Sequence, residues 1–290
     1  MSSLVARPEP VSAEPALAGA VGGRGAEREL ARLRGPSAAG LGVSVLWLSL
    51  LILIPLAAVV TKSFAGGWSG FWTAVTDEQA VASLRLTVIS SLVITVINAV
   101  MGTVLAWVLV RDEFPGKRLV EIVIDIPFAL PTIVAGLVLI SVYGPASPIH
   151  LDIYGTQKAV AFALLFVTLP FVARAVQPVL MELDVEAEQA AACLGAGRIT
   201  TFRRIVLPQL LPAIASGAGL GFARAMGEYG SVLLISGGLN RTEVTSLYAY
   251  GRIQNYDYVG AAAVSTVLLA VSLAVLLGLD VLQRQARRRG

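Results

Sequence analysis

The sequence predicts an all-α polytopic membrane protein with six transmembrane helices, and three observations support this fold class. Of its 290 residues, 56% are hydrophobic and only 14% are charged, whereas soluble domains carry about 25% charged residues. The mean hydropathy is +0.76. The apolar residues also gather into runs long enough to cross a hydrocarbon core of about 30 Å, which takes about 20 helical residues. Because these runs lack strict alternation, they favour helices over the strands of a barrel.

The first 40 residues differ from the rest of the chain. They are rich in Ala, Gly, Pro, Glu and Arg, and show no apolar periodicity beyond a short helix over residues 26–33. We therefore expect residues 1–40 to form a disordered cytoplasmic tail. The first apolar run begins near Leu41, which is too late for a secretory signal peptide.

Six apolar runs follow this tail. The first span is expected over residues 41–60, and an outer loop with Trp68, Phe71 and Trp72 completes the segment 41–79. Aromatic side chains near span ends typically anchor at the membrane interface. The remaining spans are expected at 84–110, 119–142, 159–180, 210–235 and 259–282, within a core of residues 80–282, followed by a basic cytoplasmic tail at 283–290.

Three of these spans carry residues that are unusual in lipid. The third contains Asp125 and Pro131, and we expect Asp125 to pair with a neighbouring helix or to cap backbone freed by proline. The fourth is expected to be broken at Pro170 and Pro178.

In the glycine-rich fifth span, Arg224 and Glu228 stand four residues apart, on one face of a helix. Two unrelated charges are costly in lipid, at about 2.5–3.5 kcal/mol each. The pair is therefore expected to line the translocation pathway near a gate, or else to form a static ion pair.

The distribution of Lys and Arg predicts the orientation of the chain. With the N-terminus inside, 15 of these residues flank the spans on the inner side and 5 lie on the outer side. Because positive residues accumulate on the cytoplasmic side, both termini are expected inside. The basic pI of about 9.2 follows from this placement and does not indicate a nucleic-acid partner.

The segment 184–212 is a charged, helix-prone stretch between two apolar runs, so it is expected in water on the inner side. Asp184 can cap a short helix whose first turn holds Glu186 and Glu188. Gly195 or Gly197 can end that helix. A second helix is expected over residues 199–206, with Pro208 stopping it and opening the next span. The prediction is a helix–turn–helix that can seat in another protein.

The sequence shows no motif for catalysis, metal binding or nucleotide binding. One cysteine and one histidine exclude a disulfide framework and most metal sites. The only Gly-Lys pair, Gly116-Lys117, lacks the frame of a phosphate-binding loop. No nucleophile–base cluster is visible either. We therefore expect no catalytic residue, metal or cofactor, and any ATP hydrolysis must come from a partner.

The segment at 184–208 resembles the cytoplasmic EAA loop of ABC importer permeases. Its spacing [E]AA-x3-G-x9-I-x-LP is matched here, with Gln189 where the family usually has glutamate and with Glu188 adjacent to it. The residues that carry the resemblance, and that would couple to the ATPase, are Glu188, Gln189, Ala190, Ala191, Gly195, Ile205, Leu207 and Pro208.

Further segments resemble one group of these permeases in particular. Residues 124–132, 166–180 and 222–232, with Thr242-Glu243 and Tyr256-Asp257-Tyr258, resemble sulfate/thiosulfate importer permeases, and among them the T-type (CysT/CysU) subunits. The resemblance implies the type I ABC importer (MetI-like) permease fold in the cytoplasmic membrane. It also implies two cytoplasmic ATPase subunits, a W-type sister permease or a second copy, and an extracytoplasmic sulfate-binding protein.

Two alternatives stay open. One is a molybdate or tungstate ABC permease. The other is a secondary transporter that needs no ATP, which would usually show an internal repeat or several intramembrane carboxylates.

Overall fold

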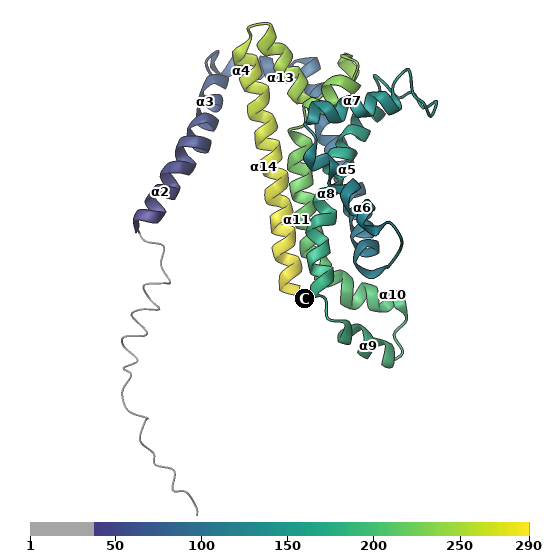
Figure 1. Cartoon of the computed structure of the whole chain (residues 1–290). Helices are drawn as coiled ribbons and strands as arrows, with labels where there is room; N and C mark the ends of the chain where they lie inside the picture. The colour runs from purple at the N-terminus through teal and green to yellow at the C-terminus, as the bar shows by residue number, and fades with distance from the viewer. Residues whose placement is uncertain (1–37, 290) are drawn as a thin grey trace, which may run out of the picture. The chain divides into compact units, whose positions relative to one another are not determined.

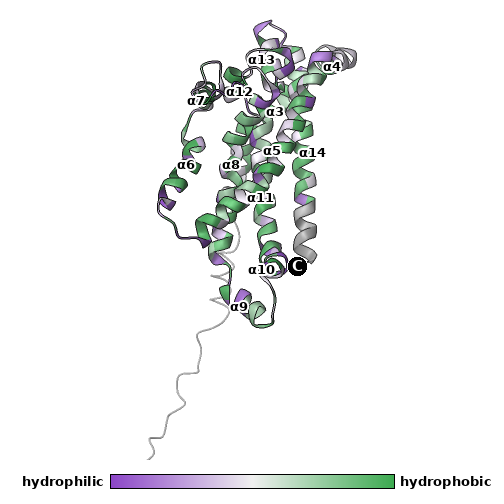
Figure 2. Ribbon diagram, turned by 90° about the vertical axis from the view of Figure 1, so that its right-hand side faces the viewer, coloured by the Kyte–Doolittle hydropathy of each residue, from purple (hydrophilic) through white to green (hydrophobic). Residues whose placement is uncertain are grey.

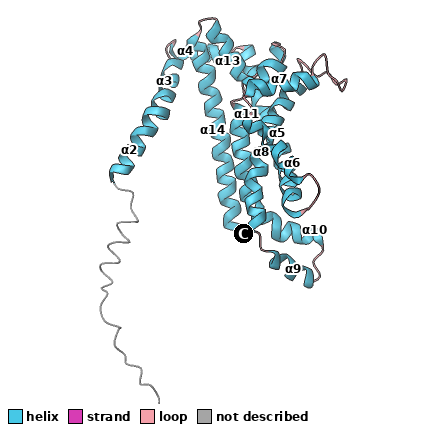
Figure 3. Ribbon diagram, viewed as in Figure 1, coloured by secondary structure: helices cyan, strands magenta, loops and turns pink. Residues whose placement is uncertain are grey.

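The computed structural model describes residues 38–289, and every regular element in that range is a helix (Figure 3). Residues 1–37 of the tail expected over residues 1–40 lie outside this range. The last three residues of that expected tail, from Ala38, instead begin helix α2. The chain forms two units that divide after Pro55.

The first span is one continuous run of helix. It is built from α2 (Ala38–Leu48), the π-helical turn η1 (Ser49–Leu53) and α3 (Ile54–Ser63), and the 24 residues of Gly40–Ser63 are long and apolar enough to cross a membrane. The π turn ends two residues before Pro55. A proline inside a helix lacks an N–H and crowds the carbonyl four residues back, and a wider turn at this point gives that carbonyl room. The first predicted span is confirmed.

Four long helices make up the bundle of the second unit: α5 (Glu78–Arg111), α8 (Gln157–Glu182), α11 (Leu207–Met226) and α14 (Tyr258–Arg289). Helix α8 packs against both α5 and α11, and α11 also packs against α14 (Figure 1). Pro170 and Pro178 lie inside α8 without ending it. The expected break of the fourth span is therefore wrong, because neighbouring helices and local adjustment can satisfy the backbone groups that proline frees in a membrane helix.

Glycine allows these helices to approach closely. A Cβ at Gly102 of α5 would lie 2.8 Å from Val172 Cβ of α8, and one at Gly217 of α11 would lie 2.8 Å from Val172 Cα. Both glycines thus bring their helices onto the same turn of α8. Small residues at such crossings are typical of membrane helices, whose association depends on close packing.

The third span is not a straight helix. It consists of α6 (Lys117–Ala129) and α7 (Thr132–Tyr143), which meet at an angle of 119°. Between them Leu130 is extended, with ψ 135°, because the residue before Pro131 is pushed out of the helical region. The prediction of one continuous span over 119–142 is corrected to this bent pair.

The fifth span ends earlier than predicted. Helix α11 ends at Met226, and the short helix α12 (Gly230–Ile235) starts after a three-residue break. Helix α12 packs against α7, where a Cβ at Gly136 would lie 2.7 Å from Ser231 O. The breaks in the third and fifth spans thus meet each other, and Glu228 falls in the break and not on the helix that carries Arg224.

Shorter elements lie at the two ends of the bundle (Figure 1). At one end are α4 (Gly67–Thr76), the 3₁₀ turn η3 (Asn240–Thr242) and α13 (Thr245–Gln254). At the other are α9 (Val185–Cys193) and α10 (Arg198–Thr201). Figure 2 shows hydrophobic residues along the long helices and hydrophilic ones concentrated toward these ends. The segment after the first span, which was expected to be an outer loop, contains helix α4.

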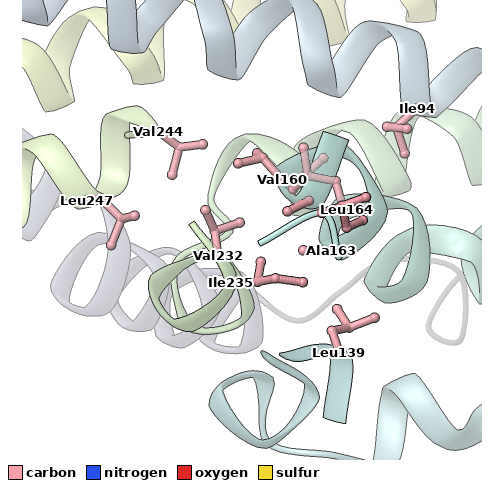
Figure 4. Close-up of a cluster of buried hydrophobic side chains, with 12 residues drawn as sticks. Ile94, Leu139, Val160, Ala163, Leu164, Val232, Ile235, Val244 and Leu247 are labelled. Carbon is pink, nitrogen blue, oxygen red and sulfur yellow. The ribbon is translucent and has the colours of Figure 1, made fainter. Parts of the chain in front are cut away.

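The main buried cluster lies where α5, α7, α8, α12 and the start of α13 meet (Figure 4). It holds Ile94, Leu139, Val160, Leu164, Val232, Ile235, Val244 and Leu247, among others. This cluster fixes α7 and α12 to the bundle, and so positions Glu228 in the break before α12.

Candidate functional site

The first helix of the predicted coupling segment forms as expected. The side chain of Asp184 accepts a hydrogen bond from Glu186 N at 2.8 Å and so caps α9. The helix ends at Cys193, and Gly195 follows with φ +81°, a left-handed conformation that favours glycine. Ala196 N then donates to Ala191 O at 3.0 Å, which closes the turn. Gly195, and not Gly197, is therefore the residue that reverses the chain.

The second helix differs from the prediction. The chain is helical without interruption from Arg198 to Met226, through α10, the π turn η2 (Phe202–Val206) and α11. Pro208 thus does not stop a helix but lies in the first turn of α11. As in the first span, a π turn ends two residues before the proline, and the Gln209 side chain donates to Ile205 O at 3.1 Å. Motion of the segment can therefore reach the membrane helix directly.

The segment is fixed to the end of α5. Glu188 of α9 forms an ion pair with Arg111, the last residue of α5. The Arg111 guanidinium lies 5.4 Å from the ring centroid of Trp107, and Trp107 packs edge-on against Phe202 of η2 at 5.5 Å. Both helices of the segment are therefore anchored to one turn of α5.

These contacts show which residue carries the negative charge that glutamine lacks at position 189. Gln189 is exposed, whereas the adjacent Glu188 carries the charge that binds Arg111. Sequence reasoning did not identify Arg111 or Trp107 as part of the site. The one available signal was their position at the inner end of a predicted span.

The outer surface of the segment is exposed and partly apolar. Leu194 is 88% exposed and Ile199 is 75% exposed. The other predicted coupling residues range from exposed to half-buried: Ala190, Gly195 and Pro208 are exposed, and Ala191, Ile205 and Leu207 are half-buried. Exposed apolar side chains beside the arginines 198, 203 and 204 are typical of a surface that binds another protein.

Arg224 and Glu228 are brought together as predicted, at 2.7 Å between Nη1 and Oε2. Glu228 Oε1 accepts hydrogen bonds from Ser231 N and Ser231 Oγ, both at 2.8 Å, and so caps α12. Its backbone carbonyl accepts from Ser246 Oγ of α13 at 2.5 Å. Glu228 is buried, whereas the Arg224 side chain is 31% exposed. The carboxylate of Glu228 thus joins α12 to Arg224 of α11, and its backbone carbonyl adds a contact to α13.

The second intramembrane pair joins α6 to α8. Arg174 Nε donates to Asp125 Oδ1 at 2.7 Å, and its Nη2 makes a second contact to Oδ2. Arg174 also donates to Gln177 Oε1 at 2.7 Å and to Glu121 O at 3.2 Å. The prediction that Asp125 pairs with a neighbouring helix is confirmed, and the bidentate geometry fixes the orientation of α6.

At the opposite end of the bundle from the coupling segment, Tyr248 of α13 donates to Asp77, the cap of α5, at 2.8 Å. This hydrogen bond lowers the pKa of Asp77. Burial, followed by the same contact, raises the pKa of Tyr248 to about 12. Arg252 lies over the Tyr248 ring at 5.2 Å and binds Asp257 at 2.9 Å, so α13 is fixed to the start of α5.

Comparisons with known proteins agree with this architecture. Residues 98–289 match the family model of binding-protein-dependent transport system inner membrane components. The chain is 42% identical over 257 residues to the sulfate transport system permease protein CysT of Salmonella typhimurium, covering 86% of this chain and 93% of that protein. The CysT protein of Synechocystis is 42% identical over 254 residues, covering 85% and 89% of the two chains.

Solved structures share the fold. A bacterial ABC transporter involved in the import of alginate has a chain with a TM-score of 0.72 at 16% identity, covering 90% of this chain and 98% of that one. The MetNI methionine ABC transporter has one with a TM-score of 0.54 at 21% identity, covering 73% and 99%. At these identities the likeness concerns the fold alone.

The helical bundle, its apolar spans and its helix–turn–helix at one end define a multi-pass membrane component of a transport system. The chain belongs to the family of binding-protein-dependent transport system inner membrane components.

Proposed function

We propose that this chain is a permease subunit of an ATP-driven importer that moves sulfate or thiosulfate across the cytoplasmic membrane by alternating access. The observation that carries the mechanism is the anchoring of residues 184–208 to the end of α5 through Glu188 and Arg111. The anion is proposed from the identity to sulfate permeases over most of the chain.

The coupling segment acts as a lever in this proposal. A partner ATPase would bind the exposed surface around Leu194 and Ile199. Because α10, η2 and α11 form one helix of 29 residues, a displacement at that surface is transmitted to the membrane part of α11, and through Arg111 to α5. A flexible loop would dissipate the same displacement.

The orientation follows from the charge distribution. Both termini and the coupling segment lie on the cytoplasmic side, with α4 and α13 on the outer side. The assembly would contain two ATPase subunits, a W-type sister permease or a second copy of this chain, and an extracytoplasmic sulfate-binding protein. A bacterial alginate ABC transporter that shares the fold has been solved in complex with an alginate pentasaccharide-bound periplasmic protein, which supports the last of these partners.

In the membrane, Arg224 is proposed to face the translocation pathway near a gate. Its side chain is partly exposed, and it lies within one turn of the break between α11 and α12. Glu228 holds this cation and ties it to α12 and α13. A shift of α12 or α13 would therefore move the arginine.

Uptake of labelled sulfate into vesicles that contain the reconstituted importer tests this function. We expect uptake that requires ATP on the side of the coupling segment and the binding protein on the other side. Uptake inhibited by molybdate far below the sulfate concentration would assign the importer to molybdate or tungstate. Uptake that continues at the same rate without ATP would contradict the proposal and favour a secondary transporter.

A further inference from the structure

A pocket of about 230 Å³ is lined by residues of α12, of α13 and of the segment between them. Helix α13 lies at the end of the bundle opposite the coupling segment (Figure 1). Its walls include Leu233, Leu239, Leu247, Glu243, Tyr250 and Gln254. The pocket therefore combines an apolar interior with one carboxylate.

The carboxylate of Glu243 is held by a hydrogen bond from a neutral side chain, which does not neutralise its charge. Its Oε2 accepts a hydrogen bond from Gln79 Nε2 at 3.0 Å, and the same amide donates to Asn240 O at 2.8 Å. Among residues 38–281, no lysine or arginine forms an ion pair with Glu243. A neutral amide fixes the direction of the carboxylate and leaves its charge in place. The pocket thus presents a negative charge in a defined position.

One wall of the pocket is aromatic. The Tyr250 ring packs against Tyr229 with 5.3 Å between centroids, and its hydroxyl accepts from Gln254 Nε2 at 2.6 Å. The face of a fixed aromatic ring attracts a cation within about 6 Å. Tyr250 therefore adds to the attraction of Glu243 for positive charge.

The shape and the charge of the pocket together indicate which kind of ligand it can bind. The three leucines suit an aliphatic stem, and Glu243 with Tyr250 suits a cationic head, which is the division of a lysine or arginine side chain. A sulfate dianion would be repelled by the unpaired carboxylate. A metal ion would find one carboxylate only, and residues 38–289 contain no cluster of three metal-ligating side chains. The pocket is thus distinct from a substrate subsite.

We propose that this pocket receives a lysine or arginine side chain of the extracytoplasmic binding protein when that protein docks on the membrane subunit. The inference rests on the proposed function, which places α13 on the outer side and supplies a soluble partner there. Glu243 is then a docking determinant on the face where the binding protein arrives. Because Gln79 belongs to α5 and α5 reaches Arg111, occupation of the pocket is connected through one helix to the coupling segment.

The test is the dissociation constant between the assembled importer in lipid nanodiscs and the fluorescently labelled sulfate-binding protein of the same organism. The Glu243→Gln variant keeps the size of the side chain and can still accept from Gln79. We expect its dissociation constant to rise about tenfold at low salt, and the difference to shrink as added salt screens the charge. Glu243→Lys is expected to weaken binding further, since two cations would then meet.

Glu78→Gln is the matched control, because Glu78 is an exposed carboxylate in the first turn of α5 at the same end of the molecule. We expect it to leave the dissociation constant unchanged, and retention of the ATPase in a pull-down shows that each variant is assembled. Equal affinities for the wild type and Glu243→Gln would overturn the docking inference and leave the proposed function standing. Failure of the wild type itself to bind the protein would overturn both.

Discussion

The carboxylate of Glu188 in α9 is paired with the guanidinium of Arg111, the residue that ends α5. The side chains are 21% and 22% exposed, with Arg111 the less exposed of the two, so water screens the pair only in part. The contact joins the helix–turn–helix of residues 184–208 to the end of the long apolar helix α5. It makes the helix–turn–helix a rigid extension of the bundle.

Neutralising this pair should uncouple hydrolysis from transport. In Glu188→Gln the segment keeps its shape through the Asp184 cap and the Gly195 turn, but loses its anchor on α5. We expect sulfate uptake per ATP hydrolysed to fall about tenfold, in line with the loss of about 1–3 kcal/mol for a charged hydrogen bond. The measurement is the ratio of uptake to phosphate release in vesicles.

Glu186→Gln provides the control for that variant, because Glu186 is an exposed carboxylate in the same helical turn. The exchanged pair Arg111→Glu with Glu188→Arg should restore part of the ratio. An unchanged ratio in Glu188→Gln would show that the ion pair is not needed for coupling.

Arg174→Ala should loosen the bent third span. The substitution leaves Asp125 without its two contacts, and an unpaired charge in a membrane protein is costly. We expect a loss of roughly 1–3 kcal/mol in stability, seen as a lower midpoint of thermal unfolding in detergent. Arg174→Lys should recover only part of it, since lysine cannot make the bidentate contact. A midpoint equal to that of the wild type would mean that α6 is held by apolar contacts alone.

Replacement of Arg224 should affect transport and not assembly. In Arg224→Ala, Glu228 loses its ion pair, but it keeps both hydrogen bonds from Ser231 and the one from Ser246, and these hold α12 and α13 in place. We expect the complex to purify with its ATPase while sulfate uptake falls at least tenfold, because the fixed cation is lost. Normal uptake by an assembled Arg224→Ala complex would remove this residue from the pathway and leave the family assignment intact.

The glycine crossing of α7 and α12 predicts a sharp steric effect. A Cβ at Gly136 would lie 2.7 Å from Ser231 O, which is backbone and cannot easily move. We expect Gly136→Ala to lower stability by about 1–3 kcal/mol. Gly197→Ala is the control, because a Cβ there meets nothing within 4 Å and its φ is −71°. Thermal unfolding that is identical for both variants would contradict the packing of the two broken spans.

The burial of Tyr248, together with its hydrogen bond to Asp77, predicts a dependence on alkaline pH. The pKa of Tyr248 is raised from its ordinary value of 10.0 to about 12. A group whose pKa is higher in the folded state stabilises that state below its unfolded pKa, and this contribution is lost as the pH rises through the folded value. Stability should therefore fall between pH 10 and about 12, and Tyr248→Phe should lack this part of the fall. Parallel curves for the two proteins would refute the assignment.

Much of this molecule could be predicted from its sequence. Long apolar runs identify the spans because, in lipid, such a run can satisfy its backbone hydrogen bonds by forming a helix. Asp184 and Gly195 predict the cap and the turn of α9, because both depend on local chemistry alone. Proline was the main source of error. Pro131 redirects the chain by 119°, whereas Pro170 and Pro178 leave α8 intact and Pro208 follows a π turn within a continuous helix.

These four prolines look alike in sequence, and only their surroundings distinguish them. The partners of the charged residues could not be predicted for a similar reason. Arg111 and Glu188 are 77 residues apart, and Arg174 and Asp125 are 49 apart. Such pairs depend on how the helices pack, which the apolar pattern of each span does not encode. Arg224 and Glu228 were predicted correctly as neighbours because their separation is local.

The most direct test of the central claim is sulfate uptake by sealed vesicles that hold the complete importer, with ATP present only on the side of residues 184–208. The account predicts uptake that stops when ATP is replaced by a non-hydrolysable analogue, and that falls about tenfold in Glu188→Gln although hydrolysis continues. Uptake that persists with the analogue, or that is the same in Glu188→Gln as in the wild type, would contradict it.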